Sequence, residues 1–371
     1  MSRRLRVLMV LGTSGGGLGR HVRDLSASLV AAGHEVVIAG PQVTQDALDL
    51  SGSGARFVRV PIAERPSVTG DPRSIRTLRT LAKGADVIHA HGLRAGALAG
   101  LARGKAGPPP LVVTLHNALV AGGAVAAAYA GLERIVAHRA DLVLGVSADL
   151  EERQRELGAR RVGHAVIAAP RPAPLRRPVE QTRQALDADP GTTLIVSVAR
   201  LAEQKGLPAL LDVSARLAAA APSAWIVVAG DGPAKDVLQQ RISRDDLPVR
   251  LLGWRDDIPD LLAAADLAVS SAVWEGQPIW LQEALIAGVP VVATDVGGTA
   301  QVVGEAAVLV PPDDPGALAD AVVTLAGDAS AREQLAAAAR RRATELPDPD
   351  AARDAALAVY VDLLSADAGD C

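Results

Sequence analysis

Two long cations in the second half of the chain stand where a phosphate could bind. Arg200 and Lys205 are five residues apart and follow the apolar run Leu194–Val198. Lys205 directly precedes Gly206. The run predicts a strand and the glycine precedes a helical pattern, so both cations would lie in front of a helix N-terminus, which itself favours anions. Cations scattered over a surface are a common alternative for this spacing alone.

Two carboxylates could accept hydrogen bonds from neighbouring hydroxyl groups of a ligand. Glu275 and Glu283 are eight residues apart, with Gly276, Gln277 and Pro278 following the first of them. Proline suits the first turn of a helix, where its missing N–H is not needed. Glu275 would then lie in the loop before the helix and Glu283 inside it, both able to accept hydrogen bonds from vicinal hydroxyls. One capping and one surface glutamate would give the same pattern.

Glycine-rich turns follow two more predicted strands in this half. Gly230 and Gly232 follow the strand 225–229, and Gly297 and Gly298 follow the strand 290–293. Such turns can offer backbone N–H groups to a phosphate. Each turn is weak evidence by itself.

The first half has a glycine loop and a histidine at strand ends. Gly16, Gly17 and Gly19 lie in the loop after the predicted strand 6–11. A nicotinamide dinucleotide site should also show an acidic residue closing the next strand, but Glu35–Ala39 is followed by glycine and proline. His116 follows the strand 111–115 and would face a cleft, or would be an ordinary histidine at a strand end.

Three further histidines raise the question of a metal. His21, His89 and His91 lie near predicted strand ends, but no carboxylate accompanies them at a fixed spacing. The pair Asp348 and Asp350 lies near the C-terminus, where a helix cap or turn is expected. We therefore expect no metal site.

Alternating apolar runs predict two α/β domains with parallel sheets. A β-loop-α-β unit opens the chain, and a second series of such elements begins after prolines 170, 172, 174 and 178, which indicate a linker. We expect the domains 1–170 and 186–346, the linker 171–185, and a C-terminal helix in 347–371 that packs back on the first domain. Doubly wound domains would place a cleft at the carboxyl ends of both sheets.

Composition excludes several classes of protein. The chain has 371 residues and a single cysteine, Cys371, so it can form no internal disulfide. The apolar run after the basic N-terminus is too short for a signal peptide, and no stretch matches a membrane span. These features predict a cytoplasmic protein.

Charge divides the chain. Residues 1–185 carry 25 Lys and Arg against 14 Asp and Glu, whereas the remainder carries 13 against 28. A basic first half indicates an anionic partner, although arginines on solvated faces would give the same count. The candidate cations are Arg56, Arg59, Arg65, Arg73, Arg76, Arg79, Lys83, Arg94 and Arg103.

Taken together, these segments resemble family 4 of the retaining GT-B glycosyltransferases, also called glycosyl transferases group 1, over nearly the whole chain. Residues 198–207 resemble the family's diphosphate-binding segment, and Glu275 to Glu283 matches its Glu-x7-Glu motif. The glycine loop 15–21 and the segment around His116 match as well. The family often has Phe-Gly where Gln277 and Pro278 stand, which changes the sugar contacts. Gln301 stands where a glutamate is common.

The resemblance implies a fold, a reaction and a site. It implies the GT-B fold, two Rossmann-like doubly wound domains that face across a cleft. It implies transfer of a sugar from a nucleotide sugar, UDP- or GDP-linked, with retained anomeric configuration. His116, Arg200, Lys205 and Glu275 would be catalytic. The donor would be bound by Gly16, Gly17, Gly19, Arg200, Lys205, Gly230, Gly232, Glu275, Gly276, Gln277, Glu283, Gly297 and Gly298.

The resemblance, together with the charge of the first half, indicates the partners. We expect a glycan or lipid-linked sugar as acceptor, in cell-envelope or polysaccharide synthesis, and a peripheral association with the anionic inner face of the cell membrane. No cofactor, metal or nucleic acid is expected. A sugar-nucleotide 2-epimerase and a non-catalytic nucleotide-sugar-binding protein are the alternatives.

Overall fold

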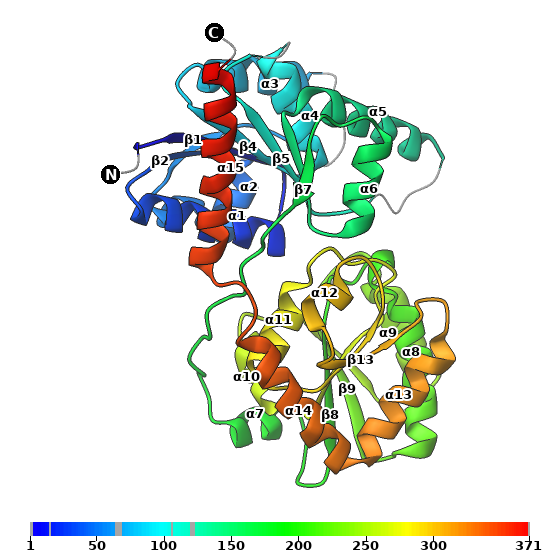
Figure 1. The fold of residues 1–371 in the computed structure, drawn as a ribbon. Helices are drawn as coiled ribbons and strands as arrows, with labels where there is room; N and C mark the ends of the chain where they lie inside the picture. Colours follow the sequence, from blue (N-terminus) through cyan, green and yellow to red (C-terminus); the bar gives the residue numbers. More distant parts are fainter. Residues whose placement is uncertain (1–2, 15, 64–68, 105–106, 119–122, 370–371) are drawn as a thin grey trace. The chain divides into compact units, whose positions relative to one another are not determined.

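The chain folds into two compact units, shown as a ribbon in Figure 1. The computed structural model describes residues 3–14, 16–63, 69–104, 107–118 and 123–369. The first unit comprises Met1–Ala168 and Pro347–Cys371, and the second comprises Ala169–Leu346.

The first unit is built on a seven-stranded parallel sheet in the order β3-β2-β1-β4-β5-β6-β7. Its central strands are buried along nearly their whole length, as expected when helices cover both faces of a parallel sheet. The strands are β1 (Arg6–Leu11), β2 (Glu35–Gly40), β3 (Arg56–Arg59), β4 (Val87–His91), β5 (Leu111–Leu115), β6 (Leu142–Gly145) and β7 (Val162–His164).

Helices on both faces of this sheet include one from the far end of the chain. The C-terminal helix α15 packs against α1, and Figure 1 shows the two side by side. The side chain of Asp348 accepts the N–H of Ala351 at 2.7 Å and so caps α15, as the sequence predicts for this aspartate. The helices are α1 (Gly17–Ala31), α2 (Gln42–Leu48), α3 (Gly70–Ala82), α4 (Leu93–Arg103), α5 (Gly123–Arg139), α6 (Ala148–Glu156) and α15 (Pro349–Gly369), with the 3-10 turn η1 (Leu50–Ser53).

The second unit repeats this arrangement with a six-stranded parallel sheet in the order β10-β9-β8-β11-β12-β13. The strands are β8 (Thr193–Val198), β9 (Ala224–Ala229), β10 (Val249–Gly253), β11 (Leu267–Ser270), β12 (Val291–Thr294) and β13 (Ala307–Val310). The helices are α7 (Val179–Ala185), α8 (Leu207–Ala220), α9 (Lys235–Arg244), α10 (Ile258–Ala264), α11 (Ile279–Ile286), α12 (Thr299–Val303), α13 (Pro315–Gly327) and α14 (Ala329–Ala343), with the 3-10 turn η2 (Glu203–Lys205).

Alternation along the strands fills an apolar core on each face of the second sheet. On β8, Ile195 belongs to the cluster under α8 and α13, whereas Leu194 and Val196 belong to the cluster on the other face. Successive side chains of a strand point to opposite faces, so one apolar run serves both cores.

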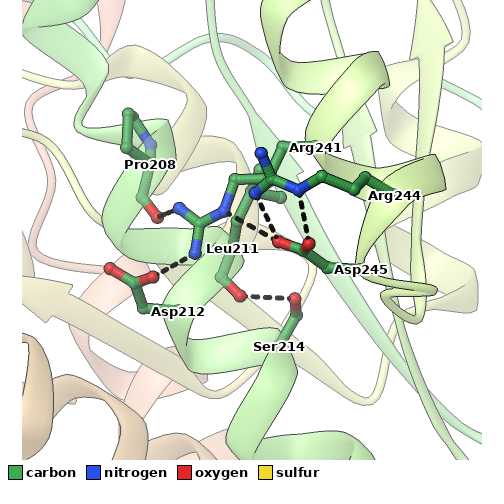
Figure 2. A network of polar contacts seen from close by, with 7 residues as sticks. All are labelled: Pro208, Leu211, Asp212, Ser214, Arg241, Arg244 and Asp245. Carbon is green, nitrogen blue, oxygen red and sulfur yellow. Dashed lines mark hydrogen bonds and ion pairs between the residues drawn. The ribbon is translucent and has the colours of Figure 1, made fainter.

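A polar network joins α8 and α9 at the surface of the second unit (Figure 2). The guanidinium of Arg241 donates to the carbonyl of Pro208 at 3.2 Å and to the carboxylate of Asp212, both at the start of α8. Asp245 bonds Arg244 at 2.7 Å and pairs with Arg241 at 3.5 Å. These groups face solvent, so they orient the two helices more than they stabilise the unit.

Each of the two sheets has a position at which a ligand could bind. The strand order reverses between β1 and β4 in the first sheet and between β8 and β11 in the second. In open parallel sheets, the crevice at the carboxyl ends of the strands at such a reversal is where ligands bind. The loops after β1 and β4, and those after β8 and β11, are therefore candidate sites, one in each unit.

The predicted fold class is confirmed, and the differences lie at edges and boundaries. The sequence predicts neither β3, β7 nor β13, and all three are edge strands, which are short and, in β3, carry arginine at both ends. The second part of the predicted linker is the helix α7. Pro278 caps α11 from outside, one residue before the position expected. Among the described residues, no helix is both long and apolar enough to cross a membrane.

Candidate active site

The loops after β8 and β11 are joined by an ion pair at the reversal point of the second sheet. Lys205 ends η2, and its Nζ donates to Oε1 of Glu275 at 2.5 Å. Only 21% of the lysine side chain and 9% of the glutamate side chain are exposed. An ammonium has three donors, so the bond to Glu275 leaves two for a ligand. Coulomb interactions with such a ligand are stronger here than in open water.

Arg200 occupies the start of the same loop. Its side chain is exposed, and among the residues that the structure describes it has no ion pair or side-chain hydrogen bond. The loop 199–206 therefore presents one solvated guanidinium at its start and one half-buried ammonium at its end.

Two glycines allow these loops to approach each other. Gly206 has φ +58, and a Cβ there would lie 1.9 Å from the carbonyl oxygen of Ser271. Gly297 has φ +52, and a Cβ there would lie 1.8 Å from the carbonyl oxygen of Glu275. No other residue fits either place without backbone movement, because the conformation and the space both exclude a side chain.

Hydrogen bonds between the loops hold Glu275 in place. Its carbonyl accepts the N–H of Gly298 at 3.1 Å. The Nε2 of Gln204 donates to the carbonyl of Trp274 at 3.1 Å, and the hydroxyl of Ser271 donates to the carbonyl of Lys205 at 3.0 Å. Three loops thus form one connected structure around the lysine and the glutamate.

The remaining predicted donor residues lie on the loops beside this pair. Gly230 donates its N–H to the carbonyl of Gly253 at 2.8 Å, and Leu201 donates to the carbonyl of Asp231, just before Gly232, at 3.0 Å. Gly276 is buried and Gln277 is half-buried before α11, and Glu283 is a half-buried residue of that helix.

In the first unit, the glycine loop leads into α1. Gly16 precedes the first helical residue, Gly17, and the N–H of Gly19 donates to the hydroxyl of Ser14 at 3.1 Å. A Cβ on Gly19 would lie 2.3 Å from a methyl carbon of Leu48, so α1 packs closely there. The neighbouring Gly15 lies outside the described residues.

Histidines gather at the reversal point of this sheet. His89 lies on β4, which ends at His91, while His116 follows β5 and His21 lies in α1. The rings of His21 and His91 are 5.5 Å apart between centroids, and those of His21 and His116 are 5.6 Å apart. The sequence predicts a cleft-lining His116, and the structure places the rings of His21 and His91 beside it.

Burial keeps the cluster uncharged at neutral pH. Desolvation lowers the pKa of His21 to about 4 and, with a smaller contribution from His21, lowers the pKa of His89 to about 3. The pKa values of His91 and His116 are lowered well below 6.5, first by burial and then by the neighbouring histidines. Within the described ranges, no group of three or more His, Cys, Asp or Glu side chains could hold a metal ion.

Family models match both units in turn. A model described as "Glycosyl transferase 4-like domain" matches residues 16–170, and one described as "Glycosyl transferases group 1" matches residues 192–328. The chain belongs to the group 1 glycosyltransferases. It is therefore an enzyme that transfers a sugar from a nucleotide sugar.

Curated relatives of this glycosyltransferase act in glycan synthesis. The glycogen synthase of Mycobacterium tuberculosis is 28% identical over 93% of this chain and 91% of its own length. The lipopolysaccharide core biosynthesis mannosyltransferase LpsB of Rhizobium meliloti is 34% identical over 43% of this chain and 47% of its own.

A solved structure has the same fold over the whole chain. Anabaena Alr3699/HepE in complex with UDP-glucose is 22% identical, with a TM-score of 0.81 over 98% of this chain and all of that one. At this identity the likeness shows the GT-B fold alone.

Two of the predicted surface cations of the glycosyltransferase are structural. Arg94 is buried and forms a bidentate pair with Asp71 at 2.7 and 3.0 Å, and Arg103 is buried against Asp141. The sequence prediction that both are available to an anionic partner is wrong, since each is used inside the first unit. Arg65 lies outside the described residues.

The sequence alone missed two features of the site. Tyr360 of α15 is fully buried and bonds His89, although the two are 271 residues apart. The chain has only two tyrosines, and this rarity is the one feature of the sequence that could draw attention to Tyr360. The contact between Lys205 and Glu275 spans 70 residues and has no signature in the spacing.

Proposed function

We propose that this glycosyltransferase transfers a sugar from a UDP- or GDP-sugar to an acceptor hydroxyl with retention of anomeric configuration. The ion pair of Lys205 and Glu275 at the reversal point of the second sheet carries the proposal. In this proposal the lysine binds the diphosphate of the donor and the adjacent glutamate binds a sugar hydroxyl. The UDP-glucose complex of the similar fold supports a uridine donor.

Each loop has a proposed role. Arg200, Lys205 and the backbone N–H groups of Gly297 and Gly298 stabilise the leaving diphosphate, whose charge grows as the bond to the sugar breaks. Lys205 makes this contact while it still holds Glu275, which with Gly276 and Gln277 positions the sugar. Glu283 accepts hydrogen bonds from the ribose, and Gly230 and Gly232 shape the nucleotide site.

The reaction needs no protein base in this proposal. The bond between the anomeric carbon and the diphosphate oxygen breaks with its electron pair on oxygen. The acceptor oxygen attacks the same face and its proton passes to a departing phosphate oxygen. Since Lys205 and Arg200 supply the positive charge, we also propose that no metal is required.

The domain roles follow from this assignment. Residues 186–346 form the donor domain, and residues 1–170 with the helix in 347–371 form the acceptor side, with 171–185 between them. On the acceptor side, Gly16, Gly17 and Gly19 contribute backbone to the donor phosphates, and His116 contacts the transferred sugar.

The acceptor is a glycan or a lipid-linked sugar in cell-envelope or polysaccharide synthesis. Relatives in glycogen and lipopolysaccharide core synthesis support a saccharide acceptor. Arg73, Arg76 and Lys83 are exposed on one side of α3 and at its end, and they support a reversible contact with an anionic membrane at the cytoplasmic face.

A panel of nucleoside diphosphate sugars tests the proposal. Release of nucleoside diphosphate from a UDP- or GDP-sugar, undiminished by EDTA, is the expected result, and NMR of the glycoside should show the donor's anomeric configuration. An epimerised donor or an inverted product would contradict the proposed reaction, and a requirement for a divalent ion would contradict the metal-free site. Glu275→Gln should abolish turnover, whereas Gln239→Ala, on the exposed face of α9, should not.

A further inference from the structure

His116 is held by a neighbouring histidine. The Nδ1 of His91 and the Nε2 of His116 are 3.2 Å apart, within hydrogen-bonding distance. His91 is 1% exposed, and its other nitrogen, Nε2, is buried without a hydrogen-bond partner among the described residues. A hydrogen bond between these nitrogens needs a proton on one of them, and the ring that carries it decides what His116 offers to a ligand.

His91 packs against a third histidine, His89, which is itself held by two hydrogen bonds. The ring of His89 lies 4.1 Å from that of His91 between centroids, at 32°. Both nitrogens of His89 are occupied, because Nδ1 bonds the hydroxyl of Tyr360 at 2.6 Å and Nε2 bonds the hydroxyl of Thr114 at 2.7 Å. The C-terminal helix therefore fixes His89, whose ring packs against His91.

His91 and His116 each carry one N–H, since burial keeps both rings neutral. If His116 donated from Nε2, His91 would carry its proton on the buried Nε2, where the part of the chain that the structure describes offers no acceptor. If His91 donates from Nδ1, its Nε2 is left with only an unshared lone pair. A buried N–H without an acceptor is rarer than an acceptor without a donor, so the second arrangement is favoured.

We propose that His91 is a positioning residue that donates from Nδ1 to Nε2 of His116 and thereby keeps the proton of His116 on Nδ1. His116 then presents a hydrogen-bond donor to its ligand and cannot act as a base. The identity of that ligand as the transferred sugar rests on the proposed function, but the position of the proton does not. A donor at this place agrees with transfer of the acceptor proton to the leaving phosphate.

Nitrogen-15 NMR of the histidine-labelled full chain tests the proton's position directly. Two-bond nitrogen–proton correlations distinguish a ring protonated on Nδ1 from one protonated on Nε2, and the chain has only seven histidines to assign. His116→Gln identifies the signal. We expect the Nδ1–H form in the wild type between pH 7 and 8. The Nε2–H form, or an even mixture, would overturn the proposal whatever the activity.

Variants at position 91 test the positioning role. His91→Leu removes the donor and should release His116 from a single tautomer, with kcat lowered roughly 10- to 100-fold, the loss that follows when a residue that orients a metal-binding histidine is removed. His91→Asn keeps an amide N–H near the place of Nδ1 and should restore the tautomer and most of kcat. An equal loss of kcat in both variants, with the tautomer of His116 unchanged, would contradict the positioning role of His91.

A matched control separates general effects of histidine loss. His138 lies exposed on α5, where its Nδ1 bonds the carbonyl of Arg134 at 2.8 Å. His138→Leu should leave the His116 signal and kcat unchanged. If the wild type shows the expected tautomer and no sugar is transferred from any donor, the proposed function fails while the assignment of the proton stands.

Discussion

At the scale of single residues, Lys205 and Glu275 are in contact, although the sequence predicts them in two separate segments, one for binding an anion and one for binding hydroxyls. Lys205→Ala should lower kcat by roughly 100- to 1,000-fold and raise the donor KM less, because the ammonium faces charge that develops in the transition state. Steady-state kinetics at saturating donor measures the effect. The buried carboxylate of Glu275 also loses its partner, so thermal melting should accompany the assay.

An exposed ion pair on the same unit is the control for this prediction. Arg216 on α8 pairs with Asp320 on α13, and 53% and 67% of the side chains are exposed. Arg216→Ala should change kcat little, since solvent screens such pairs. A Lys205→Ala enzyme with near-wild-type kcat would remove the lysine from the leaving-group role.

At the scale of elements, the loop between β12 and α12 depends on a glycine. Gly297→Ala would place a methyl group against the carbonyl of Glu275 at a positive φ, and the strain should cost on the order of 1–3 kcal/mol in the free energy of unfolding. A fall in Tm of several degrees, with weaker donor binding in calorimetry, is expected. Gly327→Ala, at the end of α13 with open space around it, is the control: it should leave donor binding unchanged and should not lower the Tm, because alanine favours a helix more than glycine does.

The helix α3 provides a second prediction at this scale. Arg73 and Arg76 are exposed on it, while Leu78 is buried toward the unit. The double variant Arg73→Glu and Arg76→Glu should reduce co-sedimentation with anionic vesicles at low salt, at roughly 1 kcal/mol for each basic residue removed. Wild-type binding that ignores lipid charge or salt would exclude this surface as the contact.

Surface arginines elsewhere control for the change of charge. Arg340 and Arg341 end α14 in the second unit and are both exposed. The same reversal of charge there should leave vesicle binding unchanged if α3 is the contact. Equal loss from both double variants would mean that only the net charge of the chain matters.

At the scale of the whole molecule, the histidine cluster links stability to pH. The pKa of His21 is about 4 and that of His89 about 3, both far below the unfolded value of 6.5, because burial disfavours the charged form. Between pH 6.5 and 4, the unfolded chain binds protons that the folded chain does not. Stability is therefore fully present above pH 6.5 and falls as the pH drops, by up to about 1.4 kcal/mol per pH unit for each such histidine.

Calorimetry at pH 7.5 and pH 5.5 checks this prediction. The first unit should have a lower melting temperature at pH 5.5 than at pH 7.5. The His21→Leu variant should show a smaller difference in melting temperature between the two pH values. The window lies above the titration of carboxylates, so their acid effects do not interfere. An equal difference in the wild type and in His21→Leu would show that His21 does not cause the pH dependence.

Much of the fold could be predicted because parallel strands covered on both faces are continuous apolar runs. β1, β5 and β8 were found in this way, and the turns after them marked where a ligand site should lie. The edge strands β3, β7 and β13 were missed because an edge strand needs no such run. Arg94 and Arg103 were misread because charge in a sequence does not show whether a carboxylate is buried beside it.

The sequence by itself determined the family, the two sheets and the loops that carry Arg200, Lys205, Glu275 and His116, since these depend on local patterns of glycine, charge and apolar residues. Only the tertiary structure decided which of them touch. The ion pair of Lys205 with Glu275 and the bond of His91 with His116 join strands that are neighbours in a sheet and distant in the chain. Strand order is set by how whole helices and sheets bury their apolar faces, so contacts between the ends of neighbouring strands leave no mark in residue spacing.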